Sequence, residues 1–153
     1  MRLNEILTGD LIFIEERKLS KKAVLDQLID SIALKTGNDK MTISAAVYDR
    51  ENKISTGIGF GIAVPHGRIK GWGKTTLAVL NAKKDVWYEA LDGEPVHLIF
   101  MFISDADNPF EHVNILAKLS YIVSEANNMT RLRGAPTTGE LYSSLLEMEK
   151  LLK

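Results

Sequence analysis

The sequence contains no cysteine, so disulfide bonds, thiolate catalysis and zinc sites built on cysteine are all excluded. Neither sign of charge is in excess, because 19 lysines and arginines face 20 aspartates and glutamates and leave a net charge of -1. That balance argues against a nucleic-acid binder that works by neutralising phosphates. No apolar run approaches the roughly 20 residues that cross a bilayer, and the first residues lack the apolar segment of a secretory signal. We therefore expect a cytoplasmic protein that does not insert into a membrane.

Two common types of catalytic centre also lack their motifs. The three histidines, His66, His97 and His112, form no His-x-x-x-His pair, and no paired-carboxylate motif accompanies them, so we expect no metal site. No Gly-x-Ser-x-Gly elbow is present, which argues against a serine hydrolase. His97 lies inside a strand-like pattern, and we interpret it as a structural or partly exposed residue.

The 153 residues, 45% of them apolar, suffice for one domain with a sizeable core. Internal repeats, low-complexity tracts and linkers are absent from the sequence, so we predict a single domain over residues 1–153. An apolar stripe with helical spacing runs from Ser20 to Gly37, which predicts a helix with both ends marked. Further helices are predicted over 42–52, from Asn108-Pro109 onward, and from about Thr137.

Strand patterns alternate with these helices. The segments 75–81 and 96–103 are the clearest, and the second is apolar at nearly every position, as in a strand buried on both faces. A turn over 91–95 separates them. The glycine-rich segment before Pro65 predicts a loop that feeds a short strand over 62–64. Strands interleaved with helices indicate an α/β layered fold.

His66 is the strongest candidate for chemistry. It lies between Pro65, which fixes φ and lacks a backbone donor, and Gly67, which has no side chain to crowd the imidazole. A histidine held at a strand end in this way is well placed to act as a nucleophile, because neutral imidazole is reactive near neutral pH and forms a labile phosphoryl adduct. The alternative is a histidine that only makes a hydrogen bond within its loop, and the spacing leaves both interpretations open.

Other residues would support an anion beside His66. Gly57, Gly59 and Gly61 would let backbone N–H groups approach an anion closely, although a glycine run alone is weak evidence. His112 is expected in the first turn of its helix, where the partial positive charge of the helix N-terminus favours an anion. Arg50 would supply a fixed cation. The alternatives are a surface histidine and a solvated arginine.

The segment STGIGFGIAVPHGR, residues 55–68, resembles the phosphorylation-site signature of enzyme IIA of the bacterial phosphotransferase system, in its fructose/mannitol class. In that class an arginine lies sixteen residues before the active histidine and a second histidine some forty-six residues after it, where this chain has Arg50 and His112. The similarity extends over most of the chain, through ALDGEPVHLIF and HVNILAKLS to RLRGAPTTGELYSSLL.

The resemblance implies a mixed β-sheet of about five strands flanked by helices on both faces. It also implies that His66 accepts a phosphoryl group from an HPr-like phosphocarrier protein, through Nε2. Arg50 and His112 would stabilise the phosphoryl oxygens, and no metal or cofactor is expected. We therefore expect the side chains of His66 and His112 to lie on the order of 4–8 Å apart. Ile58, Phe60 and Ile62 would form an apolar rim for the partner.

Two variants of this function are compatible with the sequence. The segments TGIGFGIAVPHGR, ALDGEPVHLIF and RLRGAP are more similar to the nitrogen-related regulatory branch, which relays phosphorylation state to target proteins. The alternative is a sugar-specific component that passes the phosphoryl group to a IIB cysteine. A third possibility is a binding module that is never phosphorylated. One departure from the family is Phe60, where many relatives have asparagine.

Overall fold

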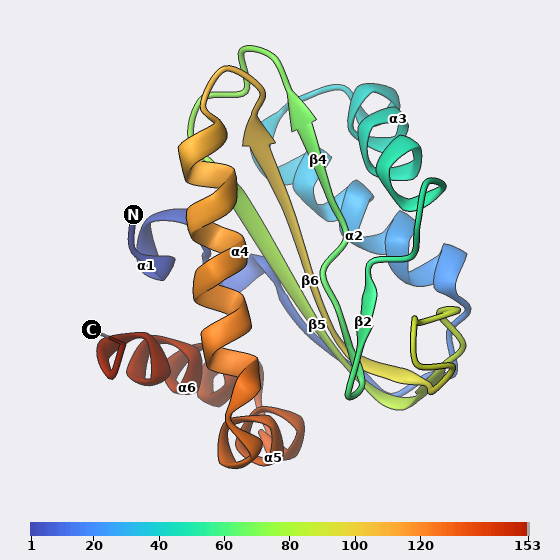
Figure 1. Cartoon of the computed structure of the whole chain (residues 1–153), viewed down its shortest axis with the longest axis vertical. Coiled ribbons are helices and arrows are strands. Elements are labelled where there is room, and N and C mark those ends of the chain that lie inside the picture. Colours follow the sequence, from blue (N-terminus) through green and yellow to red (C-terminus); the bar gives the residue numbers. More distant parts are fainter. Residues whose placement is uncertain (153) are drawn as a thin grey trace.

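A computed structural model describes residues 1–152 and shows a mixed six-stranded sheet with helices on both of its faces (Figure 1). The strands are β1 Ile12–Glu15, β2 Gly57–Gly59, β3 Ile62–Ala63, β4 His66–Ile69, β5 Thr76–Val86 and β6 Val96–Asp105. The helices are α1 Leu3–Ile6, α2 Lys21–Thr36, α3 Lys40–Glu51, α4 Pro109–Ser124, α5 Ala126–Gly134 and α6 Thr138–Lys150, with a 3-10 turn η1 over Gly9–Leu11. The predicted α/β class with a mixed, helix-flanked sheet is confirmed.

The sheet is organised around β6, its most deeply buried strand. The strand order is β1-β5-β6-β3-β2, and β4 also pairs with β6. The β5–β6 and β2–β3 pairs are antiparallel, whereas β3 and β4 run parallel to β6 and β1 runs parallel to β5. Every residue of β6 except the last is buried, which explains the continuous apolar run seen in the sequence.

The helix ends follow the expected local chemistry. Ser20 Oγ accepts the Ala23 amide at 3.1 Å, and Gly37 ends α2 with φ of 72°. Asn108 and Thr137 cap α4 and α6 through their side chains. Helix α3 begins at Lys40, two residues before the start predicted at 42, because the Asp39 carboxylate accepts the Thr42 amide and serves as the N-cap.

Two layers of helices enclose the sheet. Helices α2 and α3 lie on one face, against β5 and β4, and α4 packs on the other face against β6 (Figure 1). Helices α5 and α6 pack beside α4, and α6 also reaches β1. Buried apolar side chains from Leu3 to Met148 form one cluster between these layers. No helix within residues 1–152 combines the length and apolar character needed to cross a membrane.

His97 has the structural position that the sequence indicated. It is buried in β6, with Nδ1 3.3 Å from the Ala82 carbonyl and Nε2 3.1 Å from the Asp85 carboxylate. Both contacts lie where the register of β5 against β6 shifts, between Asn81 and Val86. The histidine therefore holds the irregular end of β5 to β6.

Candidate functional site

His66 is the first residue of β4, immediately after Pro65. We expected one strand over 62–64 ending at the proline, but β3 ends at Ala63 and a second strand begins at His66. This strand pairs with β6 so that His66 lies opposite Phe102. The imidazole stacks on the Phe102 ring, with centroids 5.0 Å apart and an interplanar angle of 12°, and is only 8% exposed.

The protonation of His66 is determined by its own loop. Its Nδ1 lies 2.8 Å from the Val64 carbonyl oxygen, and because a carbonyl can only accept, Nδ1 carries the hydrogen. Burial lowers the pKa of His66 below its ordinary value, and the charges of Arg50 and Arg68 act in the same direction; together they outweigh the Val64 hydrogen bond and the negative charge of Glu51, which raise it. A neutral ring protonated on Nδ1 has an unshared electron pair on Nε2.

His112 lies next to His66, on the first turns of α4. The two ring centroids are 4.9 Å apart and the planes meet at 69°, within the separation that we expected. His112 Nδ1 lies 3.1 Å from the hydroxyl of Ser104, which belongs to β6. Burial, together with the positive charges around it, lowers the pKa of His112 to about 4, so this ring is neutral at physiological pH.

Two adjoining cavities open beside His66, and both are lined by His66, Arg50 and Leu116. The first, of about 450 Å³, also carries the cations Lys53 and Arg68. Its complete lining is Ala46, Asp49, Arg50, Lys53, His66, Gly67, Arg68, His112 and Leu116. Three cationic side chains against one carboxylate make this cavity suited to an anion.

Arg50 projects from the last turn of α3, and its guanidinium donates to the Ile54 carbonyl at 2.7 Å. This bond restrains the arginine beside His66, the position that the family resemblance predicted for it. Arg68 was missed by the sequence reasoning. It lies two residues after His66 in β4, and side chains at i and i+2 of a strand point to the same face. The strand's alternation could have identified it, had β4 been predicted.

The glycines divide into two groups. Gly57, Gly59 and Gly61 do not line either cavity beside His66. Gly59 and Gly61, with φ of 106° and 79°, form the tight turn between β2 and β3. Gly67 does line the cavity, and it lets β4 approach α3, because a Cβ there would lie 2.8 Å from the Cβ of Ala46.

The expected apolar rim is only partly present. Ile58 and Phe60 are exposed, at 46% and 90%, whereas Ile62 is buried in the core and is not part of it. Leu91 and Ile54 are exposed beside the second cavity and take its place. Phe60 has φ of 57°, a left-handed conformation that asparagine adopts more readily than phenylalanine.

Among the described residues, no group of three or more His, Cys, Asp or Glu side chains is arranged to hold a metal ion. The site offers two neutral imidazoles, from His66 and His112, and the cationic side chains of Arg50, Lys53 and Arg68. Such a set can accept a group that carries negative charge and stabilise it once bound.

Comparison with known proteins agrees with this chemistry. Residues 5–148 match the family described as "Phosphoenolpyruvate-dependent sugar phosphotransferase system, EIIA 2". The chain is 35% identical over 150 residues to a nitrogen regulatory protein of Pseudomonas aeruginosa, covering 97% of each chain. It is 34% identical over 152 residues to the fructose-specific EIIABC component of Bacillus subtilis, covering 98% of this chain and 24% of that protein.

The fold is similar to a solved structure as well. The crystal structure of the nitrogen regulatory protein IIA-Ntr from Neisseria meningitidis matches with a TM-score of 0.87 and 28% identity, covering 94% of this chain and 98% of that one. The crystal structure of IIA mannitol from Escherichia coli matches with a TM-score of 0.74 and 19% identity, which shows the shared fold.

Proposed function

Because the chain belongs to the EIIA type-2 family of the phosphoenolpyruvate-dependent sugar phosphotransferase system, we propose that it is a phosphocarrier and that His66 is its phosphoacceptor. The observation that carries the proposal is the free Nε2 of a neutral, buried imidazole beside a cationic cavity. The donor is an HPr-like protein carrying a phosphohistidine, which places the reaction in the cytoplasm, where phosphoenolpyruvate is formed.

In the transfer step, the lone pair of His66 Nε2 attacks the phosphorus of the donor's phosphohistidine. The new N–P bond forms as the donor's N–P bond breaks, and that electron pair returns to the donor imidazole. Charge on the phosphoryl oxygens is balanced by Arg50 and Arg68, and His112 offers a hydrogen bond from Nε2 if its Nδ1 accepts the Ser104 hydroxyl. The Val64 carbonyl stabilises the positive character that His66 develops.

Exposed apolar residues beside the second cavity supply a surface on which the donor would dock. Ile54, Ile58 and Leu91 line this cavity, and Phe60 is exposed two residues after Ile58, in the β2–β3 turn. Because His66 itself is 8% exposed, the donor must press against this rim to bring its phosphoryl group within reach.

The second part of the proposal concerns the protein that lies downstream of phosphorylated His66. We favour a nitrogen-type regulatory role, in which the phosphorylation state of His66 governs binding to a target protein, because a nitrogen regulatory protein is 35% identical to this chain and the IIA-Ntr structure matches it with a TM-score of 0.87. The alternative is transfer to the cysteine of a fructose-type IIB domain, which the similarity to the EIIABC component supports.

Intact-mass spectrometry after incubation with enzyme I, HPr and phosphoenolpyruvate tests the first part. We expect one acid-labile phosphoryl group, which His66→Ala abolishes and His97→Gln retains, since His97 is bound within the β5–β6 ladder. No gain, from an HPr that phosphorylates another acceptor, would contradict the proposal and favour an unphosphorylated binding module.

The acceptor is then identified by mixing the phosphorylated protein with a fructose-type IIB domain. Loss of the phosphoryl group to the IIB cysteine would support the sugar-specific alternative. Retention of the group, together with a target that binds only one phosphorylation state, would support the regulatory role.

A further inference from the structure

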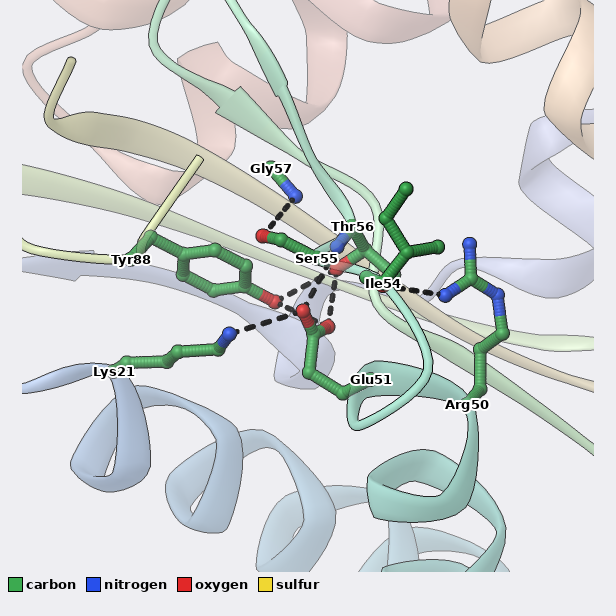
Figure 2. A network of polar contacts seen from close by, with 8 residues as sticks. All are labelled: Lys21, Arg50, Glu51, Ile54, Ser55, Thr56, Gly57 and Tyr88. Carbon is green, nitrogen blue, oxygen red and sulfur yellow. Dashed lines mark hydrogen bonds and ion pairs between the residues drawn. The ribbon is translucent and has the colours of Figure 1, made fainter. Parts of the chain in front are cut away.

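A buried carboxylate lies at the end of α3, next to Arg50. Glu51 is only 5% exposed, and its two oxygens accept four donors (Figure 2). The Thr56 amide donates to Oε2 at 2.8 Å and the Lys21 ammonium lies 3.1 Å from the same oxygen. The hydroxyls of Thr56 and Tyr88 both donate to Oε1, the second at 3.0 Å. The carboxylate thus organises residues from α2, α3 and the segments around 56 and 88.

The carboxylate is ionised in this environment. Burial alone raises the pKa of Glu51, but the hydrogen bonds from Thr56 and the charge of Lys21 outweigh it and keep the pKa below its ordinary value. Lys21 also lies over the Tyr88 ring, 4.5 Å from its centroid, so the cation is fixed from two directions. A buried charge so fully hydrogen-bonded holds its donors firmly in place.

Thr56 connects this carboxylate to the phosphoacceptor through the backbone. The Thr56 carbonyl accepts the Val64 amide at 3.0 Å, and the Val64 carbonyl accepts Nδ1–H of His66 at 2.8 Å. Three successive links, Glu51–Thr56, Thr56–Val64 and Val64–His66, therefore join the buried charge to the imidazole. The Val64 carbonyl is the atom that keeps the hydrogen on Nδ1 and leaves Nε2 unprotonated.

We propose that Glu51 is a positioning residue, which holds the Val64 carbonyl through Thr56 and so maintains His66 as the Nδ1–H tautomer that can attack through Nε2. Its catalytic meaning rests on the proposed function of His66, but the tautomer itself is a property of the unphosphorylated protein. A carboxylate that served only the stability of the fold would not affect which ring nitrogen of His66 carries the hydrogen.

The tautomer can be measured directly by long-range ¹H–¹⁵N correlation spectra of the histidine rings, recorded at a pH where His66 is neutral. Glu51→Met is the main variant, because methionine has a similar length and no acceptor for the Thr56 amide. Glu51→Gln is the rescue variant: its carbonyl can accept that amide, and the Thr56 and Tyr88 hydroxyls can rotate to accept its NH2 group. Glu149→Met is the matched control, because Glu149 also pairs with a lysine, Lys118, and accepts a backbone amide, from Leu3 at 2.8 Å.

We expect wild type, Glu51→Gln and Glu149→Met to show the Nδ1–H tautomer of His66, and Glu51→Met to gain a measurable Nε2–H fraction. Transfer from saturating phosphorylated HPr should slow in Glu51→Met by a factor on the order of 10 to 100, since small displacements of reacting groups cost rates of this size. If Glu51→Met does not fold, Thr56→Val decides: it removes the hydroxyl hydrogen bond to Glu51 and keeps the amide bond, so it should shift the tautomer in the same direction by a smaller amount, and Thr56→Ser should restore it.

A wild-type tautomer of His66 in folded Glu51→Met, or in Thr56→Val if that variant has to decide, would overturn the inference whatever the transfer rate. An equal shift in Glu149→Met would also overturn it, because the effect would then follow from lost stability alone. Failure of the wild type to accept a phosphoryl group would contradict the proposed function, and the tautomer comparison would still decide the role of Glu51.

Discussion

At the scale of single residues, the two arginines beside His66 differ in how firmly they are held. Arg50 is bound to the Ile54 carbonyl and lines both cavities, whereas Arg68 is exposed at the edge of one. A restrained cation loses less freedom when the phosphoryl oxygens gain charge, so it contributes more to the transition state. Arg50, which the family resemblance predicted, is therefore expected to contribute more to phosphoryl transfer than Arg68, which only the structure revealed.

Replacing each arginine by methionine tests this order. Arg50→Met should slow phosphoryl transfer from HPr by roughly a hundredfold to a thousandfold, the effect of removing a preorganised charge donor. Arg68→Met should slow it by on the order of tenfold. Rapid-quench measurement of His66 phosphorylation gives both rates, with Arg131→Met on α5 as a control for losing a surface arginine. Equal effects at positions 50 and 68 would contradict the argument from restraint.

The lowered pKa of His112 predicts how the stability of the protein depends on pH. Its pKa is about 4 in the folded protein, against an ordinary value of 6.5, so the unfolded chain binds the proton more readily between these values. The contribution of neutral His112 to stability is therefore complete above pH 6.5 and is lost as pH falls toward 4. His66, whose pKa is also lowered, adds to the same slope.

Urea unfolding at several pH values between about 4 and 7 measures this slope. His112→Gln cannot titrate, so its stability should fall less steeply than that of the wild type as the pH is lowered. Part of the slope should remain in the variant because His66 is unchanged. Identical slopes in the two proteins would show that His112 is not held neutral by the fold.

At the scale of elements, the β2–β3 hairpin shows that one local glycine pattern is compatible with two different uses. Alternating glycines suit a loop that binds an anion, but they also suit a turn that needs positive φ, and the sequence does not distinguish these uses. The structure uses Gly59 and Gly61 for the turn, and the Phe60 amide between them donates to the Asp92 carboxylate at 3.1 Å. Phe60 therefore has a left-handed backbone conformation, and its ring is almost fully exposed.

Phe60→Asn should therefore stabilise the protein. The left-handed conformation costs an ordinary side chain roughly 1–2 kcal/mol, asparagine tolerates it better, and an exposed ring loses little burial, so we expect a gain of about 1 kcal/mol. Urea unfolding would measure it, with Ile58→Asn in β2 as the control, since its φ is not positive. No gain over wild type, or an equal gain in Ile58→Asn, would contradict this account of Phe60.

The elements that could be predicted share one property, which is a signal contained in their own residues. The helix from Ser20 to Gly37 carries its caps, and the strand over 96–103 carries its continuous apolar run. Helix α5, whose start no side chain caps, was not predicted. The short strands β1, β2 and β4 were also not predicted, because three or four strand residues become a strand only when a neighbour pairs with them. Arg68 and Glu51 were missed for the same reason: their roles depend on which distant backbone lies beside them.

At the scale of the whole molecule, the site is built where three layers meet. α3 supplies Arg50 from one face of the sheet, β4 supplies His66 within it, and α4 supplies His112 from the other face (Figure 1). β6, buried along almost its whole length, supports these elements through its pairing with β4 and its packing with α4. Closely packed interiors resist displacement, so we expect the site to be rigid before phosphorylation.

This rigidity predicts that phosphorylation of His66 changes the charge of the surface and leaves the backbone in place. Spectra of backbone amides before and after phosphorylation should differ around 49–56, 64–68 and 104–116, which line the cavities or contact His112, and should coincide for α5 and α6. His66→Ala treated with the same donor mixture controls for added HPr and phosphoenolpyruvate.

Changes that spread through α6 and β1 would indicate a conformational switch, and a target would then recognise a new shape. Changes confined to the site would mean that a target distinguishes the two forms by the added negative charge among Arg50, Lys53 and Arg68.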